Sequence, residues 1–422
     1  MSYHAMGYCY MKRCVAFCFT LLLAHLALGQ EKKVLRKADF SDEINDFKRS
    51  SLKLLMVETP KKERLQTIKT TFEDISIPKK FNDHGIGALQ FVPLKSESKD
   101  HSTAIGQFLK EQQVARKMVA NWFNRTKNGS FDIELLKTRG LYNASAFDIQ
   151  IAKQTLRGNA LLEDAGEELI ANSFIIVNDY KYTNKEEVLS KGKTLLNDFN
   201  SLIGTKKTRD IQTSTTADAA EVLAKGYVIK TTSYLYRLVW DEATANTFFG
   251  KLWVTKDNYD KSRVAAFNDT EIFKLKYIGR QDAWADVQST KYTSKTEDEL
   301  IARATIKATD AAIARLERKF EVFRTKTPLV SIDPIAAKIG TKEGVQKGDR
   351  YEVLEQLLME DGTITYKKVT EITVNPNQIW DNSYLPEEIP DAAIEHTTFK
   401  GSSKKLYPGM LIRFKRNQNP FK

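Results

Sequence analysis

The sequence predicts an α+β fold, in which a layered domain of the α/β type precedes a small all-β, barrel-like module. Apolar runs of strand length alternate with helical stripes as far as Arg324, and the last of these helices is long and amphipathic. Short strand-like runs follow Pro328. A change of pattern at a proline is typical of a domain boundary. We therefore expect a signal peptide at 1–29, an α/β domain at 30–325 and a β module at 326–422.

The first thirty residues have the pattern of a secretory signal peptide. Lys12 and Arg13 give a positive region, and a mostly apolar run follows them. The small residues Ala27 and Gly29 suit cleavage before Gln30. The apolar run is shorter than the roughly 20 residues of a membrane span, although an uncleaved anchor is the alternative. We expect export to the periplasm or to the periphery of an outer membrane.

Cysteine usage and charge limit the classes of function. The 3 cysteines of the chain all lie in the predicted signal peptide, which excludes a disulfide framework or a thiolate metal site after cleavage. The formal net charge is +11, and the segment 399–422 contains no acidic residue. Such a tail can bind an anionic surface, whereas we expect no nucleic-acid partner. Its candidate binding residues are Lys404, Lys405, Arg413, Lys415 and Arg416.

The first elements of the mature chain are predicted from periodicity and capping signals. Residues 41–57 are expected to form a helix with Ser41 as its N-cap. Residues 85–94 are expected to form a strand, and a helical stripe of apolar residues follows between Ile105 and Trp122.

The stretch GNALLEDAGEELIANSFIIVNDY, residues 158–180, permits two interpretations. Its acids are either paired carboxylates with an acid–base role or the solvated face of a helix that leads into a buried strand. Glu167 and Glu168 are adjacent, so on a helix their side chains point apart. We therefore favour the solvated helix, followed by a strand in SFIIVNDY.

The middle of the chain is rich in aromatic residues. A helix is expected at 184–204, and strands are expected at 227–240, 247–254 and 271–279, the first two forming a hairpin. The aromatic side chains are interpreted as core, with a ligand groove as the alternative. The candidate groove residues are Tyr234, Tyr236, Trp240, Phe249 and Trp253.

The C-terminal part begins after the longest predicted helix. Ser294 and Glu297 fit a capping box at the start of that helix. After Pro328, the dipeptide Asp361-Gly362 between two strand-like runs predicts a hairpin.

A glycine turn precedes the first strand of that hairpin. Gly344 and Gly348 are expected to adopt turn conformations, and Asp349 to close the turn. The pattern of Gly344, Val345, Gly348 and Asp349 resembles the C-terminal domain of flagellar assembly T-like proteins. The larger part, on LEDAGEELI and FIIVND, is similar to exported envelope proteins of Gram-negative bacteria and to curli secretion lipoprotein-like domains. The resemblance implies a docking or assembly role. Lipid anchoring and pore formation are not implied, because the mature chain lacks a cysteine.

The sequence contains few residues typical of catalysis. Three histidines follow the signal peptide; His84 and His101 each follow an aspartate, but a third metal ligand is not identifiable. No G-x-S-x-G elbow, P-loop or complete dinucleotide fingerprint occurs. We expect no cofactor or metal, and a non-enzymatic envelope protein that binds a protein or polymer partner. The alternatives are an exported hydrolase that uses two carboxylates, and a lipid- or glycan-binding protein that uses the aromatic hairpin.

Overall fold

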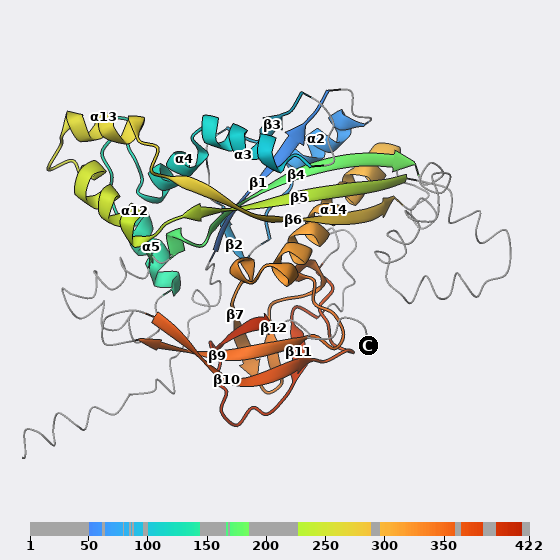
Figure 1. Ribbon diagram of the computed structural model, residues 1–422. Coiled ribbons are helices and arrows are strands. Elements are labelled where there is room, and N and C mark those ends of the chain that lie inside the picture. Colours follow the sequence, from blue (N-terminus) through green and yellow to red (C-terminus); the bar gives the residue numbers. More distant parts are fainter. Residues whose placement is uncertain are drawn as a thin grey trace, which may run out of the picture. The chain divides into compact units, whose positions relative to one another are not determined.

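The computed structural model describes much of the chain after residue 49. The described residues are 50–60, 64–78, 80–83, 86, 88–95, 100–143, 166–167, 169–184, 227–287, 296–358, 364–382 and 394–415. All of them belong to one compact unit, Phe40–Lys422. Helices and strands are mixed along this unit, so the α+β prediction is confirmed (Figure 1). The predicted signal peptide and all of the predicted helix at 184–204 except Asn184, which ends a strand, lie outside the described residues.

The first sheet has a mixed arrangement of strands. Its order is β2-β1-β4-β5-β6, and β3 also pairs with β1. The pairs of β1 with β2, β3 and β4 are parallel, whereas β4–β5 and β5–β6 are antiparallel. The strands are β1 (Ser50–Glu58), β2 (Phe81–Asp83), β3 (Phe91–Pro93), β4 (Ser173–Asn184), β5 (Tyr227–Val239) and β6 (Lys274–Val287).

Helices cover both faces of this sheet. One face packs Leu55, Val177 and neighbouring apolar residues against α3 (Ser102–Glu111), α4 (Val114–Trp122) and the segment from α12 to α13. The opposite face packs against α2 (Leu65–Glu73) and α14 (Glu297–Lys319). Figure 1 shows α3 and α4 on the other side of the sheet from α14. The remaining helical elements here are α5 (Glu134–Asn143), α12 (Glu242–Thr247), η2 (Phe248–Leu252) and α13 (Lys261–Asp269).

The apolar run in β4 is buried from both sides. Residues Ser173–Asn178 are all buried, because helices lie over each face of the strand. The predicted strand in SFIIVNDY is therefore confirmed. The predicted strands at 227–240 and 271–279 correspond to β5 and β6.

Three local predictions are wrong. Residues 50–58 form β1, not the C-terminal half of a helix. A continuous apolar run that is buried on both faces does not distinguish strand from helix by periodicity. Among the described residues of the predicted strand at 85–94, only Phe91–Pro93 is a strand. Residues 247–254 are not a strand, because α12 and the π-helical turn η2 occupy most of them.

The N-cap of α12 accounts for the error at 247–254. The carboxylate of Asp241 accepts a hydrogen bond from the backbone N–H of Thr244 at 2.8 Å, which starts a helix directly after β5. Aromatic residues are frequent in strands, but that preference depends on context, and here the capping signal prevails. No aromatic hairpin therefore exists at this position.

The long predicted helix is confirmed as α14, with a different start. Its N-cap is Thr296, whose hydroxyl accepts from the N–H of Glu299, while the Glu299 carboxylate accepts from the N–H of Thr296. The capping box therefore begins two residues later than predicted from Ser294 and Glu297. The stripe that includes Ile301, Ala308 and Leu316 is buried against the sheet.

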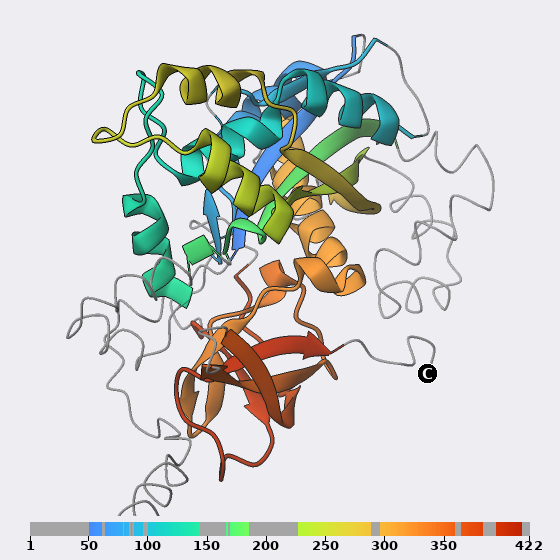
Figure 2. The ribbon, with the colours of Figure 1, turned by 60° about the vertical axis from the view of Figure 1, so that its left-hand side comes forward.

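After α14 the chain forms a second set of strands that close into a ring. Their order is β10-β11-β8-β7-β12-β9, and the ring is drawn in orange and red in Figures 1 and 2. Its interior is apolar and includes Leu329, Tyr351, Val353 and Ile412. The strands are β7 (Thr327–Ile332), β8 (Ile335–Ala337), β9 (Arg350–Leu358), β10 (Ile364–Val374), β11 (Thr397–Lys400) and β12 (Leu411–Lys415). Two short turns, η3 (Glu321–Phe323) and η4 (Thr341–Glu343), precede β7 and β9.

The predicted hairpin around Asp361-Gly362 is confirmed by its strands. β9 and β10 pair antiparallel from Arg350↔Thr373 to Leu358↔Ile364, although the connecting residues 359–363 lie outside the description. Division of the chain into two domains at residue 326 stays a prediction. Within the described ranges, no helix combines the length and hydrophobicity that are required to cross a bilayer.

Candidate functional site

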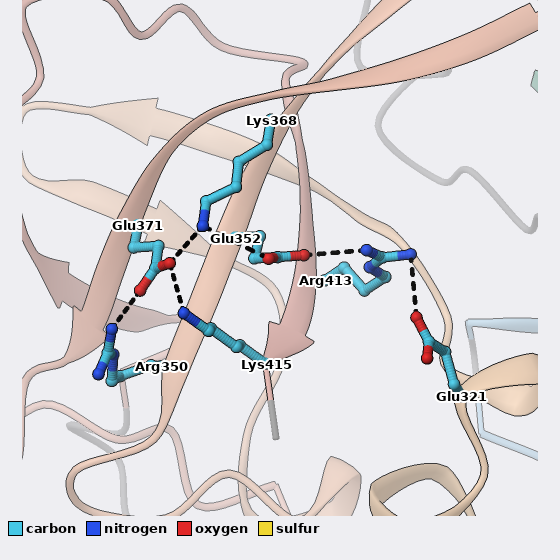
Figure 3. A network of polar contacts seen from close by, with 7 residues as sticks. All are labelled: Glu321, Arg350, Glu352, Lys368, Glu371, Arg413 and Lys415. Atoms are coloured by element: carbon cyan, nitrogen blue, oxygen red, sulfur yellow. Dashed lines mark hydrogen bonds and ion pairs between the residues drawn. The ribbon is translucent and has the colours of Figure 1, made fainter. Parts of the chain in front are cut away.

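The outer face of the closed ring carries a network of charged side chains on β9, β10 and β12 (Figure 3). We call this network the cationic face. Its cations are Arg350, Lys368, Arg413 and Lys415, and its carboxylates are Glu352, Glu371 and, from η3, Glu321. Two of the cations, Arg413 and Lys415, are candidate binding residues from the sequence.

Strand register brings these residues together. Arg413 of β12 lies opposite Glu352 of β9, and Lys415 lies opposite Arg350. On the other side of β9, Glu371 of β10 lies opposite Glu352. Alternate residues of a strand point to the same face, so Arg350 and Glu352 share the outer face while Tyr351 fills the interior.

A β-bulge adds Lys368 to this face. Lys368 and Glu371 are three residues apart, so in a regular strand they would point to opposite faces. The register of β10 against β9 shifts between Lys368 and Thr370, which adds one residue to β10. A bulge of this kind re-aims the side chains that flank it. The ammonium group of Lys368 consequently contacts the Glu371 carboxylate.

Glu371 is the centre of the network. Its carboxylate contacts Lys368, Arg350 and, at 2.6 Å, the ammonium group of Lys415. The hydrogen bonds from Lys368, Lys415 and Arg350 hold the pKa of Glu371 well below its ordinary value. Glu371 is therefore an anion at every physiological pH.

A second carboxylate, Glu352, links the two ends of the network. It accepts a hydrogen bond from Arg413 Nη2 at 2.9 Å and lies 3.6 Å from Lys368 Nζ. The other terminal nitrogen of Arg413 lies 3.6 Å from Glu321. Figure 3 shows Lys368 between Glu371 and Glu352, so one ammonium group joins the two halves.

The arrangement places like charges directly across from one another. Lys415 faces Arg350, and Glu371 faces Glu352. Directly opposed like charges on one face of a sheet repel one another, and here each pair is bridged by a side chain of opposite charge. Three cations around one carboxylate leave a local positive excess, which attracts anions.

The other basic candidates from the sequence lie elsewhere. Lys404 and Lys405 are exposed in the turn before β12, outside the strands that carry the cationic face. Arg416 lies outside the described residues. Sequence reasoning missed Arg350 and Lys368, because their place in the network follows from strand register and from the bulge.

The aromatic candidates are part of the core of the first sheet. Tyr234 and Tyr236 are 1% and 2% exposed, whereas Trp240, Phe249 and Trp253 are partly buried and pack against the same core. The Tyr234 hydroxyl accepts from the N–H of His101 at 3.0 Å, and the Tyr236 hydroxyl donates to a backbone carbonyl. The preferred interpretation as core is consistent with this packing.

Two described acids from the 158–180 stretch have defined partners, namely Glu167 and, beside His101, Asp179. Glu167 accepts a hydrogen bond from the indole N–H of Trp240 at 3.1 Å, so its carboxylate is not merely solvated. Glu163, Asp164 and Glu168 lie outside the described residues.

Of the two histidines that follow an aspartate, the structure describes His101. His101 is buried, and its Nε2 lies 3.6 Å from the carboxylate of Asp179, whereas His84 is outside the description. Among the residues that the structure describes, no cluster of three or more His, Cys, Asp or Glu is placed to hold a metal ion.

The predicted glycine turn connects the ring to α14. Gly344 and Gly348 have φ values of 76° and 85°, which confirms the predicted turn geometry. Asp349 accepts from the N–H of Gln346 at 2.8 Å, which closes the turn. The same carboxylate forms a bidentate pair with Arg318 of α14, with two contacts of 2.8 Å.

Two further buried ion pairs involve the same face of α14. Glu317 and Lys80 lie 2.5 Å apart and are each about one-tenth exposed in their side chains. Asp310 lies 3.6 Å from Lys342 of η4. Burial raises the pKa of Glu317, and it raises the pKa of Asp310 to about 6, although the nearby lysines oppose both shifts.

No protein-family model matches the chain, and a search of curated proteins finds no significant similarity. The function of the cationic face must therefore be argued from its own geometry.

Proposed function

We propose that this chain is a non-enzymatic envelope protein, exported to the periplasm or the outer-membrane periphery, that binds an anionic polymer or protein partner. In this proposal a layered α/β domain carries a small barrel-like module, and the cationic face of that module contacts the partner. The observation that carries the proposal is the convergence of Arg350, Lys368 and Lys415 on the single carboxylate of Glu371.

The exposure of the cations supports a binding role. The side chains of Arg350 and Lys368 are 49% and 45% exposed, so a partner can reach them. Surface ion pairs contribute little to stability on average, and directly opposed like charges reduce that contribution further.

The rigidity of the strands that carry the cations also favours binding of a partner. The cations extend from three adjacent, hydrogen-bonded strands, whose inner faces pack in an apolar core. Binding groups on strands are held more firmly than groups on loops, which reduces the entropic cost of binding. Lys404 and Lys405, in a turn, lack this support.

Binding to simple charged polymers tests the proposal. The mature protein should bind carboxymethyl-dextran but neither neutral dextran nor cationic diethylaminoethyl-dextran, and raising the salt concentration should weaken binding by screening. The double substitution Arg350→Gln/Lys368→Gln should weaken binding by about 25-fold, since each unit charge about 4 Å away in water contributes about a factor of five.

The matched control removes two charges from the exposed turn. Lys404→Gln/Lys405→Gln makes the same change in net charge, and we expect it to weaken binding by less than about threefold. Equal losses in the two double variants would show that net charge, not the cationic face, determines binding. Absence of binding to any anionic polymer would refute the proposed function.

A further inference from the structure

We propose, as an extension of the proposed function on which it rests, that Glu371 occupies the position of a ligand's anionic group. The ligand we infer is a polysaccharide that bears phosphate monoesters. One phosphate group would displace the Glu371 carboxylate and contact Arg350, Lys368 and Lys415.

The first argument is the charge at this position. With Glu371 displaced, the four cations of the network would face only the carboxylates of Glu352 and Glu321, which leaves an excess of two positive charges. Lys368 is shared with Glu352, which still leaves a positive excess at the centre. A phosphate monoester carries up to two negative charges near neutral pH, and it therefore matches the excess better than a carboxylate does.

The second argument is the number and direction of the donors. Arg350 comes from β9, Lys368 from β10 and Lys415 from β12, and their nitrogens converge on one carboxylate, as Figure 3 shows. A phosphate group offers three terminal oxygens, so it can accept from all three cations at once. A carboxylate has two oxygens, and in Glu371 the same oxygen accepts from both lysines.

The third argument is that Glu371 is able to move. Its side chain is 22% exposed, at the outer surface of the ring, and it has rotatable bonds that an incoming anion can exploit. Glu352 is held separately, by a hydrogen bond from Arg413 at 2.9 Å and by Lys368 at 3.6 Å. Displacement of Glu371 would therefore leave the rest of the cationic face in place.

A polysaccharide is preferred over a membrane surface for a geometric reason. The three cations converge on one carboxylate, and the donors are arranged around that single position. Such an arrangement selects one group at a time, which suits phosphates spaced along a chain, whereas a lipid surface is bound by basic residues spread over a wider area.

The test compares two substitutions that change the net charge equally. Glu371→Gln removes the internal anion, and Glu355→Gln removes a carboxylate from the same ring, three residues and about 10 Å along β9 from Glu352. Binding of fluorescent dextran phosphate is measured by anisotropy at pH 7.5 and 0.15 M salt. Thermal unfolding of each variant establishes that the fold is intact.

We expect Glu371→Gln to tighten binding about fivefold, since one unit charge at about 4 Å in water corresponds to about a factor of five. Glu355→Gln should change binding by less than about twofold, because screening operates over about 8 Å at this ionic strength. Lys368→Gln should weaken binding about fivefold. The parent protein should also prefer dextran phosphate to carboxymethyl-dextran of equal substitution.

The outcomes separate this inference from the proposed function. Suppose that the parent binds anionic dextrans but that Glu371→Gln and Glu355→Gln change the affinity for dextran phosphate by the same factor. Glu371 then does not compete with the phosphate group for the three cations. Equal binding of phosphate and carboxymethyl dextrans would overturn the preference for a phosphate group. Tighter binding to vesicles that contain phosphatidic acid would overturn the choice of a polysaccharide. If no anionic polymer binds to any variant, the proposed function itself fails.

Discussion

Substitution of Asp310 tests whether the carboxylates beside α14 are buried in the folded protein. It is 8% exposed on the helix, and its nearest cation is the ammonium group of Lys342 at 3.6 Å. Burial raises its pKa from 3.8 to about 6; Lys342 opposes the shift, and the charge of Glu343 adds to it. We predict that Asp310→Asn removes a pH-dependent part of the free energy of unfolding.

The sign and magnitude follow from proton linkage. The folded state holds the Asp310 proton more firmly than the unfolded state does, so its contribution to stability is fully present below pH 3.8. This contribution is lost as the pH rises through about 6. Since one pKa unit corresponds to about 1.4 kcal/mol, the complete loss is about 3 kcal/mol. About 2 kcal/mol of it falls between pH 4 and pH 8.

Urea unfolding of the parent and of Asp310→Asn from pH 4 to pH 8 measures this contribution. The asparagine does not titrate, so the variant should gain about 2 kcal/mol relative to the parent over this range. Glu317 and Asp349 have raised pKa values in both proteins, and their contributions largely cancel in the difference.

A second variant checks the role of the neighbouring cation. Lys342→Gln removes the charge that lowers the pKa of Asp310, so the pH dependence of this variant should be steeper than that of the parent. The opposite outcome is that the parent and Asp310→Asn differ in free energy of unfolding by an amount that is constant to within about 0.5 kcal/mol from pH 4 to pH 8. That result would show that Asp310 is not buried in the folded protein.

Further predictions address the ring, its contact with α14 and the export signal. Gly344→Ala should destabilise the protein by at least about 2 kcal/mol in urea, because φ is positive and the added Cβ would lie 2.8 Å from a side chain of α14. Gly348→Ala, also at positive φ but with open space around it, should lower the free energy of unfolding by only about 1 kcal/mol. Arg318→Met leaves a buried carboxylate unpaired and should cost about 3 kcal/mol, and a loss below about 1 kcal/mol would contradict the buried pairing. N-terminal sequencing should find Gln30 first, not an intact signal peptide. Residues 326–422 alone should give a strand-rich circular dichroism spectrum and a cooperative melt, whereas a disordered fragment would refute the domain division.

Part of the fold was accessible from the sequence because its signals are local. β4 has an apolar run of strand length, α14 has a long amphipathic stripe, and the hairpin of β9 and β10 has a favourable turn dipeptide. The glycine turn was predicted for the same reason, since positive φ is a property of one residue and its neighbours.

The wrong predictions concern segments whose local sequence signals conflict or do not distinguish a strand from a helix. β1 is apolar on both faces, so its sequence fits a buried helix as well as a strand. Residues 247–252 have aromatic side chains that are typical of strands, yet the cap at Asp241 places them in helical turns. The partner of Asp349 was also missed, because Arg318 precedes it by 31 residues and belongs to another element.

By itself, the sequence placed β4, β5, α14 and the hairpin of β9 and β10, and it supplied the basic residues Arg413 and Lys415. Only the tertiary structure decided what those residues face. The cationic face requires Arg350, Lys368 and Glu371 from two other strands, a matching register and a bulge of one residue. A shift of one residue would turn each side chain to the other face of its strand. The physical reason is that local propensity fixes a strand, whereas electrostatic partners are fixed by pairing between segments distant in the chain.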